Sequence, residues 1–76
     1  MTQEETQDKS YDDIAIAMFA AAMKNKMDVS RIKGRTGWQD CSVDDLLKMF
    51  NEHVEKGDFI DIGNFSMMLW FRTQKI

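Results

Sequence analysis

The sequence predicts an all-α fold, a small three-helix bundle with helices at about 11–33, 43–56 and 59–72. The chain of 76 residues contains no proline and only four glycines, so few residues interrupt helices. It contains seven methionines and a cluster of alanines between residues 15 and 22, which favour helices over strands. Three of the glycines, at positions 34, 37 and 57, fall between the apolar segments. This composition and the placement of the glycines therefore favour helices over a β-sheet.

Two helices follow one another in the second half of the chain, separated only by Gly57. Ser42 is followed three residues later by Asp45, and Asp58 by Asp61, which is the spacing of the capping box that starts a helix. Gly57 suits the left-handed conformation that ends a helix, so Asp58 can begin the next helix immediately. The 43–56 helix is amphipathic, and its apolar positions share one face: Val43, Leu46, Leu47, Phe50 and Val54.

The first helix is predicted to open at Ser10, which Asp13 follows at capping distance, and to end before Gly34. Residues 1–9 are polar and acidic, so we expect a disordered tail without fixed contacts. Residues 10–76 then form a single helical domain. The first half of this helix is apolar on nearly all sides, and core packing and a dimer seam both account for that surplus.

The 59–72 helix carries two apolar stripes on roughly opposite sides. Gly63 interrupts it, which indicates that a neighbouring backbone comes close there. A domain this small cannot bury both stripes completely, so we expect Met67, Trp70 or Phe71 to be partly exposed. By contrast Phe50, Phe65 and Leu69 are predicted to be buried.

The loop after the first helix contains Trp38, a large apolar side chain in a polar segment. It either covers the end of the helical core or anchors an interface, because tryptophan and arginine are enriched at binding hot spots. The candidate partner-binding residues are the aromatic, cationic and adaptable side chains near this loop and on the last two helices: Arg35, Trp38, His53, Met67, Trp70 and Phe71.

Charge and cysteine usage limit the classes of function. The 13 acidic and 10 basic residues leave a net charge of −3, which argues against binding nucleic acid by phosphate neutralisation. The single Cys41 excludes an internal disulfide, so a reducing cytosol is expected. The longest apolar run, residues 14–23, is too short to span a bilayer, and no membrane association is expected.

A spaced set of residues resembles a motif of small bacteriophage and prophage accessory proteins, most of which have no assigned activity. The matching residues lie between about 31 and 72 and read Arg35-x-Gly37-Trp38-x-Asp40, then Cys41-Ser42, then His53-Val54-x-Lys56-Gly57-Asp58-x-x-Asp61-x-x-Asn64-Phe65-x-Met67-Met68. Phe59 stands where that family commonly has proline, and Gly63 where alanine is common. The resemblance implies a phage-encoded protein in the cytoplasm of a bacterial host, and it supplies no catalytic residues.

The sequence offers little for catalysis, and we expect no enzyme, cofactor or metal. A cation site is one interpretation of His53, Asp58, Asp61 and Asn64, but two of these residues have a structural role in helix capping, and metal sites need convergent, sheltered ligands. Nothing orients a nucleophilic pair of Cys41 and His53. A helix-turn-helix DNA reader needs basic and polar side chains on its recognition helix, and would here require a dimer to gather the cations of the first helix and the following loop. Those cations are Lys24, Lys26, Arg31, Lys33 and Arg35.

The function predicted from the sequence is therefore protein–protein interaction. Surplus apolar surface, two tryptophans and seven methionines suit a surface that adapts to a partner. Combined with the resemblance, this predicts a small module that binds and inhibits a host or phage machine, such as a defence or replication enzyme. A homodimeric accessory protein is the alternative, and a DNA-binding regulator is a weaker one.

Overall fold

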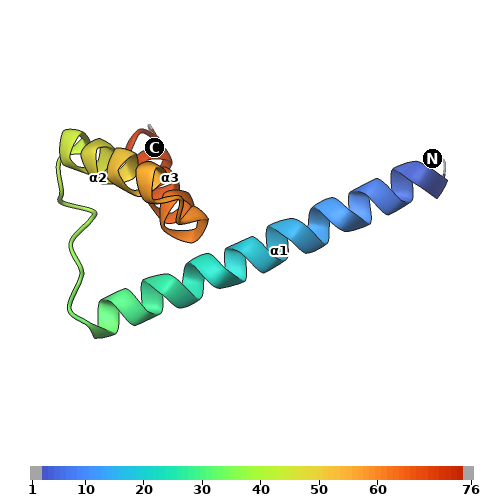
Figure 1. The fold of residues 1–76 in the computed structure, drawn as a ribbon, viewed down its shortest axis with the longest axis horizontal. Coiled ribbons are helices and arrows are strands. Elements are labelled where there is room, and N and C mark those ends of the chain that lie inside the picture. The colour runs from blue at the N-terminus through green and yellow to red at the C-terminus, as the bar shows by residue number, and fades with distance from the viewer. Residues whose placement is uncertain (1–2, 75–76) are drawn as a thin grey trace.

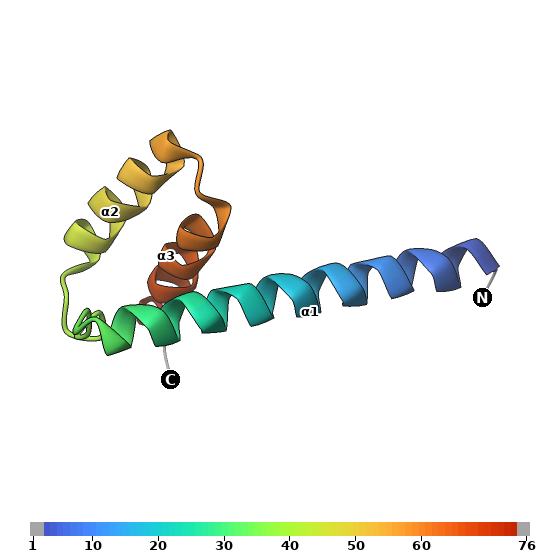
Figure 2. The same ribbon diagram turned by 60° about the horizontal axis from the view of Figure 1, so that its bottom comes forward.

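The computed structural model describes residues 3–74, with side chains from residue 7 onward, as three helices (Figure 1). They are α1 (Gln3–Ile32), α2 (Val43–Lys56) and α3 (Phe59–Arg72). The predicted all-α, three-helix fold is confirmed. α2 and α3 form a tight hairpin, and α1 crosses α3 (Figures 1 and 2). α3 is the central element, since across residues 3–74 the backbones of α1 and α2 do not touch.

α1 begins at Gln3, eight residues before the predicted start at Tyr11. Ser10, predicted as its cap, lies inside the helix, and residues 3–9 of the predicted tail are helical. The reason is local: no proline or glycine interrupts this segment, and its Glu, Gln and Lys residues are good helix formers. An ion pair one turn apart, Lys9 Nζ to Asp13 Oδ2 at 2.7 Å, adds modest support. Residues 1 and 2 lie outside the described part of the chain.

The end of α1 is fixed by a Schellman motif, which explains why the helix stops where the sequence predicts. The Arg35 N–H donates to the Ser30 carbonyl, and the Gly34 N–H donates to the Arg31 carbonyl, both at 2.9 Å. Gly34 has φ +84°, a conformation that side-chain-bearing residues rarely adopt.

The predicted caps of α2 and α3 are also present. Ser42 Oγ accepts a hydrogen bond from the Asp45 N–H at 3.1 Å, and Asp58 Oδ1 accepts one from the Asp61 N–H at 3.2 Å. Gly57 has φ +72°, as predicted. The Asp61 N–H holds the pKa of Asp58 below its ordinary value, because the bond favours the charged carboxylate. This cap therefore stabilises the fold at neutral pH and is lost as pH falls through the lowered pKa.

Among residues 7–74, the buried core is small and consists of Leu46, Met68 and the polar side chain of Asn64. The prediction that three further side chains are buried is wrong, because each is only half-buried: Phe50, Phe65 and Leu69. The α2–α3 hairpin is a single layer that α1 covers only in part, so most apolar side chains keep one side open to solvent.

α1 packs closely against α3 at Gly63. A Cβ atom at this position would lie 2.5 Å from Phe19 Cζ, too close for any real contact. The predicted close approach at Gly63 is thus present, but the neighbour is a phenyl ring rather than a backbone. One turn along α1, the Asn64 side chain donates to the Met23 carbonyl at 3.2 Å.

The N-terminal half of α1 extends beyond the α2–α3 hairpin (Figures 1 and 2). The radius of gyration is 15.3 Å, whereas a compact domain of this length has about 11 Å. Residues 7–21 are exposed throughout. None of the helices within residues 3–74 is long and apolar enough to cross a membrane.

Leu46 provides a direct test of the core. Replacing it with alanine should cost about 2–5 kcal/mol, because its side chain is fully buried and its loss removes apolar contacts in the core. Net stability in so small a domain is roughly 3–5 kcal/mol, so Leu46→Ala should be largely unfolded by circular dichroism. Its exposed neighbour is the control: Leu47→Ala should stay within about 0.5 kcal/mol of the native protein in urea titration. Equal effects of the two changes would contradict this core.

The hairpin depends on the left-handed backbone at Gly57. Gly57→Val should destabilise the protein by at least about 1–2 kcal/mol, because an L-residue is strained at positive φ and β-branching adds to the strain. Gly57→Asn should lose distinctly less, since asparagine tolerates this conformation. Urea unfolding of the two variants measures the difference, and a Val variant as stable as the Asn variant would exclude the conformation.

Candidate functional site

The six predicted partner-binding residues do not form one site. The structure divides them among an aromatic patch at the C-terminal end of α3, a central cavity, and a groove between α1 and α3. Trp38 belongs to the patch and to the cavity, and so joins them. The residues concerned are Arg35, Trp38, His53, Met67, Trp70 and Phe71.

We call the three aromatic residues at the C-terminal end of α3 and in the adjoining loop the aromatic patch: Trp38, Trp70 and Phe71, of which Trp38 and Phe71 are in contact. Trp38 meets Phe71 edge to face, with ring centroids 5.8 Å apart and planes at 80°. This geometry is favourable for aromatic pairs. Trp38 is half-buried, whereas Trp70 is 64% exposed and Phe71 is also exposed. The prediction that large side chains of α3 remain uncovered is confirmed.

Arg72 fixes the patch, and sequence reasoning did not identify it. Its Nη1 donates to the Trp38 carbonyl at 3.0 Å and also to the Cys41 carbonyl. Charged donors make the stronger class of hydrogen bond, so the last turn of α3 holds the loop at both of these points. Because the bonds span more than thirty positions of sequence, no local pattern points to them.

The central cavity has a volume of about 460 Å³ and lies between the three helices and the loop 33–42. Its apolar floor includes Leu46, Phe65 and Met68. Arg35, Trp38 and His53, all predicted as partner-binding residues, line its wall.

An ionic cluster on this wall links the three helices. The Asp61 carboxylate lies 3.5 Å from Lys26 Nζ and 3.7 Å from His53 Nε2. His53 Nδ1 is 2.8 Å from the Met49 carbonyl, which only accepts, so Nδ1 carries hydrogen. The imidazole also packs against Phe65 at 4.8 Å. His53 Nδ1 is therefore bonded within the fold, whereas Nε2 forms an ion pair with Asp61 only when the imidazole is protonated.

Asn64, which the sequence analysis considered only for a cation site, instead lies between two of these regions. Only 4% of its surface is exposed, and while Nδ2 bonds to α1, the buried Oδ1 has no partner among the described residues. A buried polar atom without a partner costs stability. Asn64 lines both the central cavity and the groove between α1 and α3, and half-buried Met67 also lines that groove.

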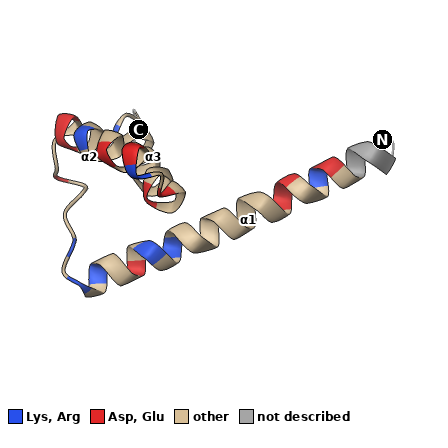
Figure 3. Cartoon of the chain, in the orientation of Figure 1, with Lys and Arg blue, Asp and Glu red and all other residues tan. Residues whose placement is uncertain are grey.

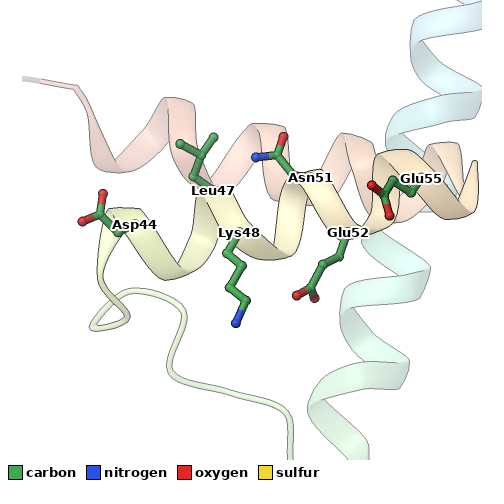
Figure 4. Close-up of a pocket in the computed structure, with 6 residues that line it drawn as sticks. All are labelled: Asp44, Leu47, Lys48, Asn51, Glu52 and Glu55. Carbon is green, nitrogen blue, oxygen red and sulfur yellow. The ribbon is translucent and has the colours of Figure 1, made fainter.

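The outer face of α2 is polar, as its sequence pattern indicates. A shallow hollow there is lined mostly by charged side chains that stand away from α3: Asp44, Leu47, Lys48, Asn51, Glu52 and Glu55 (Figure 4). Such a surface suits solvent contact more than a buried interface.

Residues considered for other chemistry have structural roles. Within the described part of the chain, no three His, Cys, Asp or Glu side chains converge as a metal site. Asp58 caps α3, while Asp61 pairs with Lys26 and His53. Two of the five cations considered for DNA binding are also occupied, because Lys26 pairs with Asp61, and Arg31 pairs with Asp28.

No protein-family model matches this sequence, and no curated protein or solved structure is similar enough to it to count as a relative.

Removing the Arg72 guanidinium should loosen the loop 33–42 without unfolding α2. Arg72→Ala should cost about 1–3 kcal/mol, because two charge-assisted hydrogen bonds are lost. Amide hydrogen exchange should accelerate at Asp40 and Cys41, whose N–H groups bond within this loop. Lys48→Ala, which removes an exposed cation from α2, is the control and should leave loop exchange unchanged. Unaltered loop exchange in Arg72→Ala would contradict the tethering role.

Proposed function

We propose that this chain is a protein-interaction module that acts by binding rather than by catalysis. The resemblance to phage accessory proteins makes the proposal more specific. The chain is then phage-encoded and works in the cytoplasm of a bacterial host. There it binds and inhibits a host or phage machine, such as a defence or replication enzyme.

The observation that carries this proposal is the exposure of Trp70 beside Phe71. An indole that is 64% exposed leaves a large apolar area in contact with water. Burying that area against a partner would contribute about 25 cal/mol of favourable free energy per Å² of apolar surface. Tryptophan is the residue type most characteristic of interface hot spots, and clustering with a second aromatic residue adds to this preference.

The patch is also held in place before any partner arrives. Trp38 packs edge to face against Phe71, and a hydrogen bond from Arg72 holds the Trp38 carbonyl against α3. Trp70 and Phe71 both lie on α3, so their backbones are fixed by helix hydrogen bonds. A preorganised surface loses less conformational entropy on binding, which favours affinity.

The surroundings of the patch suit a protein partner better than a small molecule. Arg35 and Trp38 line the wall of the adjoining cavity, so a protruding partner side chain would meet aromatic and cationic groups together. The exposed Trp70 itself stands on a helix surface, which is the geometry of a convex contact rather than of an enclosing pocket.

The proposal is tested by affinity capture from bacterial host cells with tagged native protein and with a Trp70→Ala, Phe71→Ala double variant. The native bait should recover a protein that the double variant loses, because the variant lacks the proposed anchors. Phe59→Ala is the matched control: it removes an exposed phenyl group from the opposite end of α3 and should retain the partner. Circular dichroism checks that all three baits are folded. Identical recovery by all baits would refute this surface.

A further inference from the structure

One side of α1 carries a stripe of apolar side chains that no other element covers, which we call the α1 stripe. It comprises Tyr11, Ile14, Met18, Ala21, Val29 and Ile32. Met18 is 68% exposed and Ile32 85%. Tyr11, Met18, Asn25 and Ile32 recur every seven residues, and Ile14 and Ala21 repeat the same interval. This is the heptad spacing by which two helices pack along a common seam.

The α1 stripe is distinct from the side of α1 that packs on α3. Phe19, Met23 and Lys26 make the contacts with α3. At 3.6 residues per turn, these three lie roughly a third of a turn from the centre of the stripe. Figures 1 and 2 both place the α2–α3 hairpin on one side of α1, which leaves its other side open.

The exposed length of α1 is difficult to explain for an isolated chain. Residues 7–21 are exposed, and α1 begins four residues earlier still. Residues 3–13 are mostly polar, but residues 14–21 are exposed and carry only apolar side chains, which water solvates poorly.

The solvent-accessible surface area of the chain indicates how much area a partner could cover. The chain of 8.9 kDa exposes 6238 Å², whereas a folded monomer of that mass exposes about 4,800 Å². The excess of roughly 1,400 Å² exceeds the about 800 Å² that each partner contributes to a standard protein interface. One interface along α1 is therefore enough to account for it.

The charges of α1 indicate what covers the stripe. Residues 8–13 contain three acids and one base, whereas residues 24–32, up to the end of α1, contain three bases and one acid. Figure 3 shows this polarity, with red segments toward the N-terminal end and mostly blue segments toward the other end. A second α1 running antiparallel would place each acidic segment beside a basic one. A parallel partner would instead set like charges side by side.

We propose that the α1 stripe is the seam of an antiparallel dimer, in which α1 of a second copy covers it. The stripe runs from Tyr11 to Ile32, so its midpoint lies between Ala21 and Ala22. A two-fold axis there pairs Tyr11 with Ile32 of the second copy. The small alanines at the axis let the helices approach closely. Asn25 meets Met18 and, with Asp28, which continues the seven-residue series of Ile14 and Ala21, is one of two polar residues along the seam that limit slippage of the register. This surface is separate from Trp70 and Phe71. The dimer and the proposed function are therefore independent proposals, and the failure of one does not contradict the other.

Light scattering of the full chain after size exclusion tests the dimer. The native protein should have about twice the chain mass of 8.9 kDa and should dissociate on dilution. Met18→Glu should raise the dissociation constant at least about tenfold, because it places a charge in the seam. Ile16→Glu is the matched control: Ile16 is also 68% exposed, but lies on another side of α1 and should leave the dimer intact. A native monomer, or equal responses to the two substitutions, would overturn the proposal.

Cysteine cross-linking tests the orientation and does not depend on how the Glu variants fold. In a Cys41→Ser background, a mixture of Tyr11→Cys and Ile32→Cys chains should form a mixed disulfide dimer, while neither chain alone should cross-link. A dimer of Tyr11→Cys with itself would establish a parallel pairing and refute the antiparallel one. Cross-linking in none of these samples, with a native dimer present in solution, would place the interface elsewhere.

Discussion

The contact between α1 and α3 is the constraint on which the rest of this structure depends. It consists of the Phe19 ring lying on Gly63, the Asn64 side chain bonded to the Met23 carbonyl, and an ion pair from Lys26. Without this contact, the α2–α3 hairpin would be a two-helix layer with one face bare, and α1 would have no support. Since the contact uses only the middle of α1, it leaves one end of that helix projecting and the α1 stripe open.

Local features of this fold were predictable because their causes lie within a few residues. Ser42 and Asp58 cap their helices, and Gly34 and Gly57 end the preceding ones, since each bond is made to a residue at most five positions away. The start of α1 was misplaced for a related reason. A capping pair at Ser10 looks the same whether or not the preceding residues are helical, and their good helix propensity decided the outcome.

The candidate site was predictable only in part. Exposure of Trp70 and Phe71 followed from the apolar surplus of α3, which is a property of composition and spacing. The Arg72 and Asn64 contacts were not predictable, because each joins residues 31 or more positions apart and depends on how the helices are placed. His53 was predicted as a partner-binding residue, and the structure shows its Nδ1 bonded to the Met49 carbonyl and its Nε2 facing Asp61, which is a contact between helices that the sequence did not indicate.

The environments of the two indoles give the molecule an optical signal of its own. Trp38 is half-buried and in contact with Phe71, whereas Trp70 is mostly in water, so their emission should differ in wavelength and in accessibility to a soluble quencher. A molecule that docks on the aromatic patch would shield Trp70 and shift its emission to shorter wavelength. Pairing along α1 would leave both indoles as they are. Intrinsic fluorescence thus distinguishes the two kinds of association without any label.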